Sequence, residues 1–209
     1  RFPSYLAPAM TQLPELPLTL SRQEIRKMIR QRRRALTPEQ QQEMGQQAAT
    51  RMMTYPPVVM AHTVAVFLSF DGELDTQPLI EQLWRAGKRV YLPVLHPFSA
   101  GNLLFLNYHP QSELVMNRLK IHEPKLDVRD VLPLSRLDVL ITPLVAFDEY
   151  GQRLGMGGGF YDRTLQNWQH YKTQPVGYAH DCQLVEKLPV EEWDIPLPAV
   201  VTPSKVWEW

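Results

Sequence analysis

Short apolar runs that alternate with helix-like segments constrain the fold of this sequence more than any other feature. Residues 63–68 and 89–93 are two such runs, and neither shows the regular polar alternation of a strand with one exposed face. Residues 76–86 between them have the length of a crossover helix, and Gly87 follows where such a helix would end. The three segments predict a βαβ unit, in which a helix joins two parallel strands.

Similar segments continue along the chain. Ser21 with Glu24, and Thr37 with Gln40, have the capping-box spacing that marks a helix start. We expect helices at residues 22–36, from residue 38 to the Pro56-Pro57 pair, and at residues 112–119 and 160–168. We expect further strands at residues 103–106, 137–142, 175–178 and 199–202.

Buried strands that alternate with helices predict an α/β fold with a mostly parallel sheet flanked by helices. We assign this fold to a single domain over residues 21–209. The preceding residues 1–20 are rich in proline, and we expect them to be a disordered lead.

The composition narrows the class of protein. The chain has 22 basic and 22 acidic residues, so the protein as a whole has no electrostatic footprint for nucleic acid or an anionic membrane. Its apolar runs are far shorter than the roughly 20 residues that a spanning helix needs. Its single cysteine cannot form an internal disulfide. We therefore expect a cytoplasmic protein without a membrane partner, as a monomer or weak dimer.

Residues 151–163 form a glycine-rich segment that follows one predicted strand and opens one predicted helix. In an open α/β sheet, ligands lie beyond the carboxyl ends of the strands, where a helix start offers unpaired N–H groups to an anion. Glycines let the backbone approach a phosphate closely. The segment carries Gly155, Gly157, Gly158 and Gly159.

Two common nucleotide motifs do not fit this segment. The Walker pattern needs a lysine, and the segment has none. The dinucleotide pattern needs a third glycine where this chain has Phe160 or Asp162. Instead, Phe160, Tyr161 and Asp162 follow the glycines directly, and a carboxylate beside bound phosphate needs a cation between them. The pattern predicts magnesium there, with Arg153 and Arg163 as candidate donors to phosphate.

Motifs along nearly the whole chain from Ser21 carry a resemblance to a known family. They are the basic first helix, Phe67-Leu-Ser69 with Glu73 and Thr76, residues 89–93, residues 153–163, Trp193-Asp194 and Val201-Thr202. The sequence resembles the 5-formyltetrahydrofolate cyclo-ligases, also called methenyltetrahydrofolate synthetases. The resemblance implies a magnesium-dependent ligase that converts 5-formyltetrahydrofolate and ATP to 5,10-methenyltetrahydrofolate, ADP and phosphate. It further implies that ATP phosphorylates the formyl oxygen before the ring closes.

The resemblance also implies roles for individual residues. Those implied to bind ATP are Arg22, Arg26, Arg153, Leu154, Gly155, Met156, Gly157, Gly158, Gly159, Phe160 and Tyr161. Those implied to contact folate are Leu68, Glu73, Phe160 and Tyr161, and those implied to hold the metal are Asp162 and Asp194. Some relatives carry a basic residue at the position of Met156 and a lysine at that of Gly158. The arginines at 22, 26, 153 and 163 are the candidates to compensate for these two missing cations.

Other functions fit parts of the sequence. A chain that kept the loop but lost turnover would be a non-catalytic folate- or nucleotide-binding protein. Residues 26–34 carry six basic residues that would suit RNA, although a helix would spread most of them over a solvated face. His180 beside Cys182 suggests a thiol hydrolase, but such close spacing rarely builds a catalytic pair. Asp71 and Glu73 resemble paired acid–base carboxylates, and we favour a substrate-contacting glutamate beside a turn aspartate.

Overall fold

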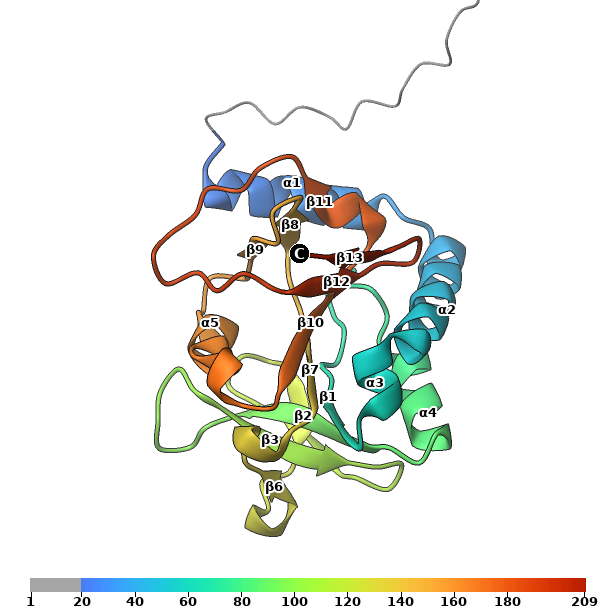
Figure 1. Cartoon of the computed structure of the whole chain (residues 1–209), viewed down its shortest axis with the longest axis vertical. Helices are drawn as coiled ribbons and strands as arrows, with labels where there is room; N and C mark the ends of the chain where they lie inside the picture. Colours follow the sequence, from blue (N-terminus) through green and yellow to red (C-terminus); the bar gives the residue numbers. More distant parts are fainter. Residues whose placement is uncertain (1–19) are drawn as a thin grey trace, which may run out of the picture.

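The computed structural model describes residues 20–209, so the lead expected over residues 1–20 lies outside the described residues except for Leu20. Within residues 20–209, five α-helices surround a central sheet (Figure 1). The helices are α1 (Arg22–Arg34), α2 (Pro38–Thr54), α3 (Pro56–Met60), α4 (Gln77–Arg85) and α5 (Phe160–Leu165).

The strands form one large sheet and two small ones. The large sheet contains β1 (Thr63–Ala65), β2 (Arg89–Leu95), β3 (Leu103–Tyr108), β6 (Val131–Leu132), β7 (Val139–Thr142), β10 (Gln174–Tyr178), β12 (Ala199–Val201) and β13 (Val206–Glu208). The small sheets contain β8 (Ala146–Asp148), β9 (Arg153–Leu154) and β11 (Leu184–Val185), and β4 (Leu114–Met116) with β5 (His122–Pro124).

The large sheet has the order β13-β12-β10-β7-β1-β2-β3-β6. Its middle strands, from β12 to β2, pair in parallel, while β13, β3 and β6 pair antiparallel with their neighbours. The predicted mostly parallel sheet and the predicted βαβ unit of β1, α4 and β2 are therefore confirmed. From β1 the chain passes to β2 on one side and later to β7 on the other. Such a switch point is where ligands bind in open α/β sheets, beyond the carboxyl ends of the strands.

Both faces of the sheet are covered, which explains why its central strands read as continuous apolar runs. Val64 belongs to a cluster with buried residues of α2, α3 and α4. Its neighbour Ala65 faces the opposite side, in a cluster that contains Leu165 of α5. In Figure 1, α2 to α4 lie on one side of the sheet and α5 on the other.

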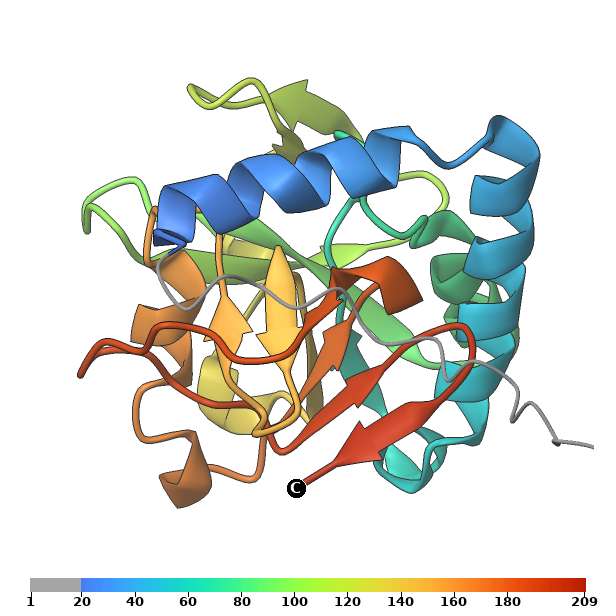
Figure 2. The same cartoon turned by 90° about the horizontal axis from the view of Figure 1, so that it is seen from above.

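Helix α1 begins as the sequence predicts, with a reciprocal capping box between Ser21 and Glu24. Ile25 and Ile29 are buried in a third apolar cluster, with Leu154 and Val185 of the three-stranded sheet. Figure 2 shows α1 lying across the strands of this sheet. The small sheet thus provides the apolar surface on which α1 packs, near the ends of the central strands.

One helix prediction is wrong, because residues 112–119 form no helix and include β4 of a hairpin with β5. The Asn117 side chain accepts hydrogen bonds from the backbone N–H groups of Leu119 (2.8 Å) and Ile121 (3.2 Å) and so stabilises a turn. Glu123 ties the hairpin to β2 by accepting from the Leu95 N–H at 3.1 Å. These contacts outweigh local helix propensity.

The structure also differs from expectation after two of the predicted helices. The Pro56-Pro57 pair ends α2 as predicted, but it also begins α3, because proline is tolerated in a first helical turn. The helix expected over residues 160–168 ends at Leu165 and is followed by a short 3-10 turn, Trp168–His170.

Strand β10 gives a test of the packing. A Cβ on Gly177 would lie 2.8 Å from side-chain carbons of both Leu144 and Val200 and 2.9 Å from one of Leu197. We expect Gly177→Ala to lower the free energy of unfolding in urea by about 1–3 kcal/mol through overpacking. Gly87→Asn is the control, because no atom lies within 4 Å of its Cβ position and asparagine tolerates its φ of +75°. Equal stability of the two variants would contradict the packing account.

Candidate functional site

The candidate site lies where α1, the glycine loop and the segment after β1 meet. Arg26 of α1 is buried, and its Nε donates a hydrogen bond to the Gly155 carbonyl at 2.8 Å. Its guanidinium also lies 3.8 Å from the position of a Cβ on Gly157. Burial, and then the positive charges of Arg22 and Arg30, lower the pKa of Arg26. This concentration of positive charge against an open backbone loop is suited to an anion.

Arg22, one turn earlier, is held by Asp194. Its Nη1 donates to Asp194 Oδ2 at 2.6 Å and its Nη2 to Oδ1 at 3.2 Å. The Glu191 N–H also donates to Oδ2 at 2.8 Å. Although burial alone would raise the pKa of Asp194, the bonds from Arg22 and Glu191 hold it below its usual value. Both oxygens of this carboxylate are therefore already engaged.

Arg153 lies beneath the glycine loop, which explains one of the glycines. Its Nη2 donates to Asp162 Oδ1 at 2.8 Å, and the Ile195 N–H donates to the same oxygen at 3.2 Å. A Cβ on Gly155 would lie only 2.9 Å from Arg153 Nη1. This partly buried ion pair thus joins β9 to α5 and supports the loop between them.

Arg163 braces the other end of the loop. Its Nε donates to the Gly101 carbonyl and its Nη2 to the Gly158 carbonyl, both at 2.5 Å. Gly159 is the N-cap of α5 with a φ of 70°, and a Cβ there would lie 2.8 Å from Arg163 Nη1. No sequence signal pointed to Gly101, because its link to the loop depends on the tertiary fold.

Glu73 stands in the turn after β1 and accepts a hydrogen bond from the Phe70 N–H at 3.0 Å. Burial raises the pKa of Glu73 to about 7, against the opposing effects of that hydrogen bond and of the charge of Arg33. Burial, and then the charge of Glu73, raise the pKa of Tyr161 at the start of α5.

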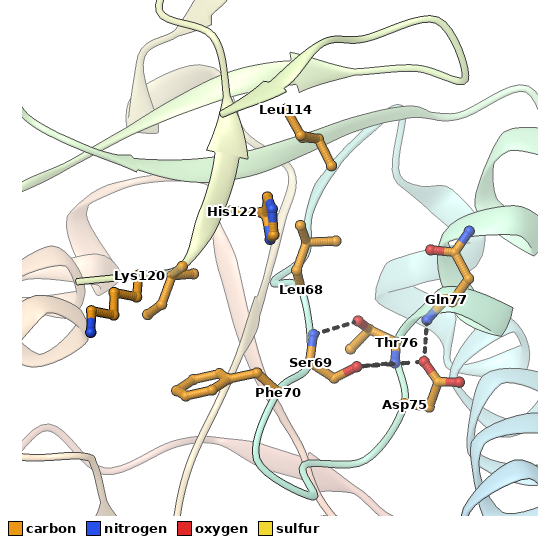
Figure 3. A pocket seen from close by; sticks show the side chains of 10 residues that line it. Leu68, Ser69, Phe70, Asp75, Thr76, Gln77, Leu114, Lys120 and His122 are labelled. Carbon is orange, nitrogen blue, oxygen red and sulfur yellow. Dashed lines mark hydrogen bonds between the residues drawn. The ribbon is translucent and has the colours of Figure 1, made fainter. Parts of the chain in front are cut away.

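A pocket of about 560 Å³ opens beside this turn (Figure 3). Leu68, expected to contact folate, lines it, and Figure 3 shows Leu68 beside His122 of the β4–β5 hairpin. The other lining residues are Ser69, Phe70, Asp75, Thr76, Gln77, Leu114, Lys120 and Ile121. The hairpin residues could not be foreseen, because a helix was expected at Leu114 and the hairpin depends on tertiary contacts.

The remaining loop residues differ in their surroundings. Leu154 is buried against α1 and anchors the start of the loop. Met156 is 52% exposed. The Phe160 ring lies 5.4 Å from the guanidinium carbon of Arg163.

The geometry does not favour the thiol-hydrolase interpretation. His180 is buried with its Nε2 3.2 Å from the Gly72 carbonyl oxygen, and burial lowers its pKa to about 4. Burial also raises the pKa of the Cys182 thiol, which opposes formation of a nucleophilic thiolate. Among residues 20–209, no helix is long and apolar enough to cross a membrane.

Comparison with known proteins gives consistent matches. The model of the 5-formyltetrahydrofolate cyclo-ligase family matches residues 19–203. A Haemophilus influenzae protein named 5-formyltetrahydrofolate cyclo-ligase is 53% identical over 179 residues, covering 86% of this chain and 96% of that protein. A Mycolicibacterium smegmatis protein of the same name is 31% identical over 188 residues, covering 88% of this chain and 95% of that protein.

A solved structure agrees with these matches. The NMR structure of Aquifex aeolicus 5,10-methenyltetrahydrofolate synthetase is 28% identical to this chain, with a TM-score of 0.76. The likeness covers 90% of this chain and 92% of that one. The family resemblance and the predicted fold class are thereby confirmed.

The raised pKa of Glu73 predicts a pH-dependent stability. Because the pKa is about 7 in the folded protein against a usual 4.5, its stabilising contribution is complete below pH 4.5 and is lost as the pH rises through about 7. Glutamine stays neutral. We therefore expect Glu73→Gln to match the wild type in urea unfolding at pH 4.5 and to exceed it at pH 8 by about 1–3 kcal/mol.

The control for this measurement is Glu81→Gln, since Glu81 is an exposed glutamate beside Arg85 on α4. It should show no such gain at pH 8. A Glu73→Gln variant whose stability relative to wild type is the same at both pH values would contradict the raised pKa.

Proposed function

The chain belongs to the 5-formyltetrahydrofolate cyclo-ligase family, and we propose that it converts 5-formyltetrahydrofolate and ATP to 5,10-methenyltetrahydrofolate, ADP and phosphate. The observation that carries this proposal is the convergence of the loop, of Arg26 and of the Glu73 turn beyond the ends of the central strands. A site that binds both the ATP phosphates and the folate requires these three elements to lie close together.

The nucleotide phosphates are proposed to lie against the glycine loop at the start of α5. Backbone N–H groups of Gly157, Gly158 and Gly159 are the proposed donors, and Arg26 supplies positive charge from α1. Arg163 holds the Gly158 carbonyl and so fixes the loop from its far side. This arrangement places positive charge outside the loop, in a chain that lacks a basic residue at Met156 and a lysine at Gly158.

The folate is proposed to enter along the segment after β1. The p-aminobenzoyl group is proposed to occupy the partly apolar pocket beside Leu68, and Glu73 would accept N–H bonds from the pterin ring. Acceptance at both carboxylate oxygens requires the ionised form of Glu73. Phe160 and Tyr161 are the proposed aromatic neighbours of the two substrates.

The protein has to position the formyl oxygen at the γ-phosphate. In the proposed reaction this oxygen attacks the γ-phosphorus and ADP leaves; the second folate nitrogen then attacks the formyl carbon, and phosphate departs with the oxygen. Such chemistry depends on positioning and charge neutralisation more than on a protein nucleophile. The Arg153–Asp162 ion pair connects β9 to α5 and so fixes their relative position for this reaction.

Magnesium is proposed as the cofactor, and Asp162 would hold it. One oxygen of Asp162 serves Arg153 and the Ile195 N–H, which leaves Oδ2 as the ligand that fits. Within residues 20–209 no group of three or more metal-ligating side chains occurs, as suits an ion that takes phosphate oxygens and water. When bound, it would neutralise charge on the transferring phosphoryl group. Asp194 fits less well, because Arg22 engages both its oxygens.

Location and assembly stay predictions. We propose a cytoplasmic protein with ATP and the reduced folate as its partners, since its single cysteine, Cys182, is a free thiol. A monomer or weak dimer remains the expected state in solution.

Activity is tested by following methenyl-folate absorbance. We expect it to grow only when ATP, magnesium and 5-formyltetrahydrofolate are all present. Asp162→Asn should lower kcat by about 100-fold or more and weaken the dependence on magnesium. Asp130→Asn, an exposed aspartate in the β5–β6 connection, is the control and should behave as wild type.

If folded wild-type protein forms no product with all three components present, the proposal that the protein is an enzyme is rejected. The alternative is then a non-catalytic folate- or nucleotide-binding protein. A fully active Asp162→Asn variant would reject the metal assignment alone.

A further inference from the structure

The turn that presents Glu73 has a left-handed backbone. The Glu73 N–H donates to the Phe70 carbonyl at 3.1 Å, closing a tight turn around Asp71 and Gly72. Both central residues have positive φ, 51° at Asp71 and 77° at Gly72. Asp-Gly is a sequence that suits such a turn, because glycine adopts this region freely and aspartate tolerates it. Tertiary contacts then fix where the turn lies.

The C-terminal half of α1 supplies such contacts. Arg34 Nη2 lies 3.1 Å from Asp71 Oδ1, while Arg30 Nε and Arg33 Nη2 lie 3.9 Å and 4.0 Å from Oδ2. The Arg33 side chain is only 4% exposed, and its Nε has no hydrogen-bond partner in the described part of the chain. A buried cation that is incompletely paired is costly, so its presence beside the turn asks for an explanation.

The turn is also held from the side opposite to Asp71. The Gly72 carbonyl accepts a hydrogen bond from Gln41 Nε2 at 3.2 Å, and His180 Nε2 lies 3.2 Å away. A Cβ on Gly72 would lie 3.3 Å from the Cβ of Arg33. The turn thus packs directly on Arg33 and has little freedom to move.

Arg33 and Asp71 also bracket Glu73 electrostatically. The positive charge of Arg33 favours the ionised glutamate, and the negative charge of Asp71 opposes it. From α5, Tyr161 is affected by the charge of Glu73, and His180, which is neutral at assay pH because burial lowers its pKa to about 4, lies against the Gly72 carbonyl. Among these groups, Arg33 supplies the positive charge that acts on Glu73.

We propose that Arg33 and Asp71 are positioning residues of the folate site, which hold the turn that presents the Glu73 carboxylate to the pterin. The inference rests on the proposed function, because it assigns Glu73 to folate. Neither residue is proposed to touch substrate. Arg26 and Arg33 are seven residues apart, about two helical turns, so one face of α1 serves both the nucleotide loop and the folate turn.

The test uses Arg33→Met and Asp71→Asn. Methionine keeps an apolar stem without the charge, and asparagine tolerates positive φ as well as aspartate does. Since the ionised glutamate binds folate, kcat/KM for 5-formyltetrahydrofolate should rise with pH through about 7 in the wild type. We expect the pH midpoint of this rise in kcat/KM, which we call the limb, to move to higher pH in Arg33→Met and to lower pH in Asp71→Asn. Each shift should be about half a pH unit or more.

At pH 8.5, above the limb, both variants should raise the KM for folate about 5- to 10-fold, with kcat within about twofold. The ionisations of the folate are common to all variants and cannot produce opposite shifts. Asp127→Asn is the control, because Asp127 also pairs with an arginine, the exposed Arg129, two residues along the chain. It should leave the profile and the KM unchanged.

A purely structural role would lower the melting temperature of both variants and leave the limb at the wild-type pH. That result, or shifts in the same direction, would overturn the proposal. If Arg33→Met does not fold, the sign of the shift in Asp71→Asn decides the outcome alone. Wild-type protein without turnover would instead reject the proposed function, so the two failures are distinguishable.

Discussion

The structure depends on how α1 is seated across the strand ends. Its apolar residues Ile25 and Ile29 are buried on the three-stranded sheet, and this packing draws charged neighbours out of solvent. Arg26 is buried in consequence, and a buried charge is tolerated only with polar partners. The Gly155 carbonyl supplies one such partner, and the remaining positive potential is directed at the loop. Hydrophobic packing of one helix thus creates the electrostatic character of the site.

Features encoded by neighbouring residues could be predicted from the sequence. The capping box at Ser21, the βαβ unit and the glycine loop before Phe160 each depend on local spacing, and the structure contains all three. The β4–β5 hairpin could not be predicted, because it depends on side-chain bonds of Asn117 and on the link from Glu123 to β2. Local propensity carries no information on such bonds.

The same distinction separates the parts of the site. The residue types expected at the loop follow from a motif, but the partners of its arginines do not. Arg153 turns under the loop to Asp162, and Arg163 reaches to Gly101 across 62 residues of sequence. A motif identifies which side chains are available, whereas the tertiary fold decides which of them brace the backbone and which face the ligand.

Glycine at position 158 illustrates how the site could retain phosphate binding without a lysine in the loop. The Gly158 carbonyl accepts a bond from Arg163, which turns the peptide so that a cation supports the loop from outside. A lysine side chain contributes a mobile charge, whereas a braced loop contributes backbone N–H groups whose directions are fixed before the ligand arrives. Fixed donors lose less conformational entropy on binding than a flexible side chain does. In the proposed function, a braced backbone would therefore take the place of a mobile cation, with positive charge supplied by Arg26 and Arg163.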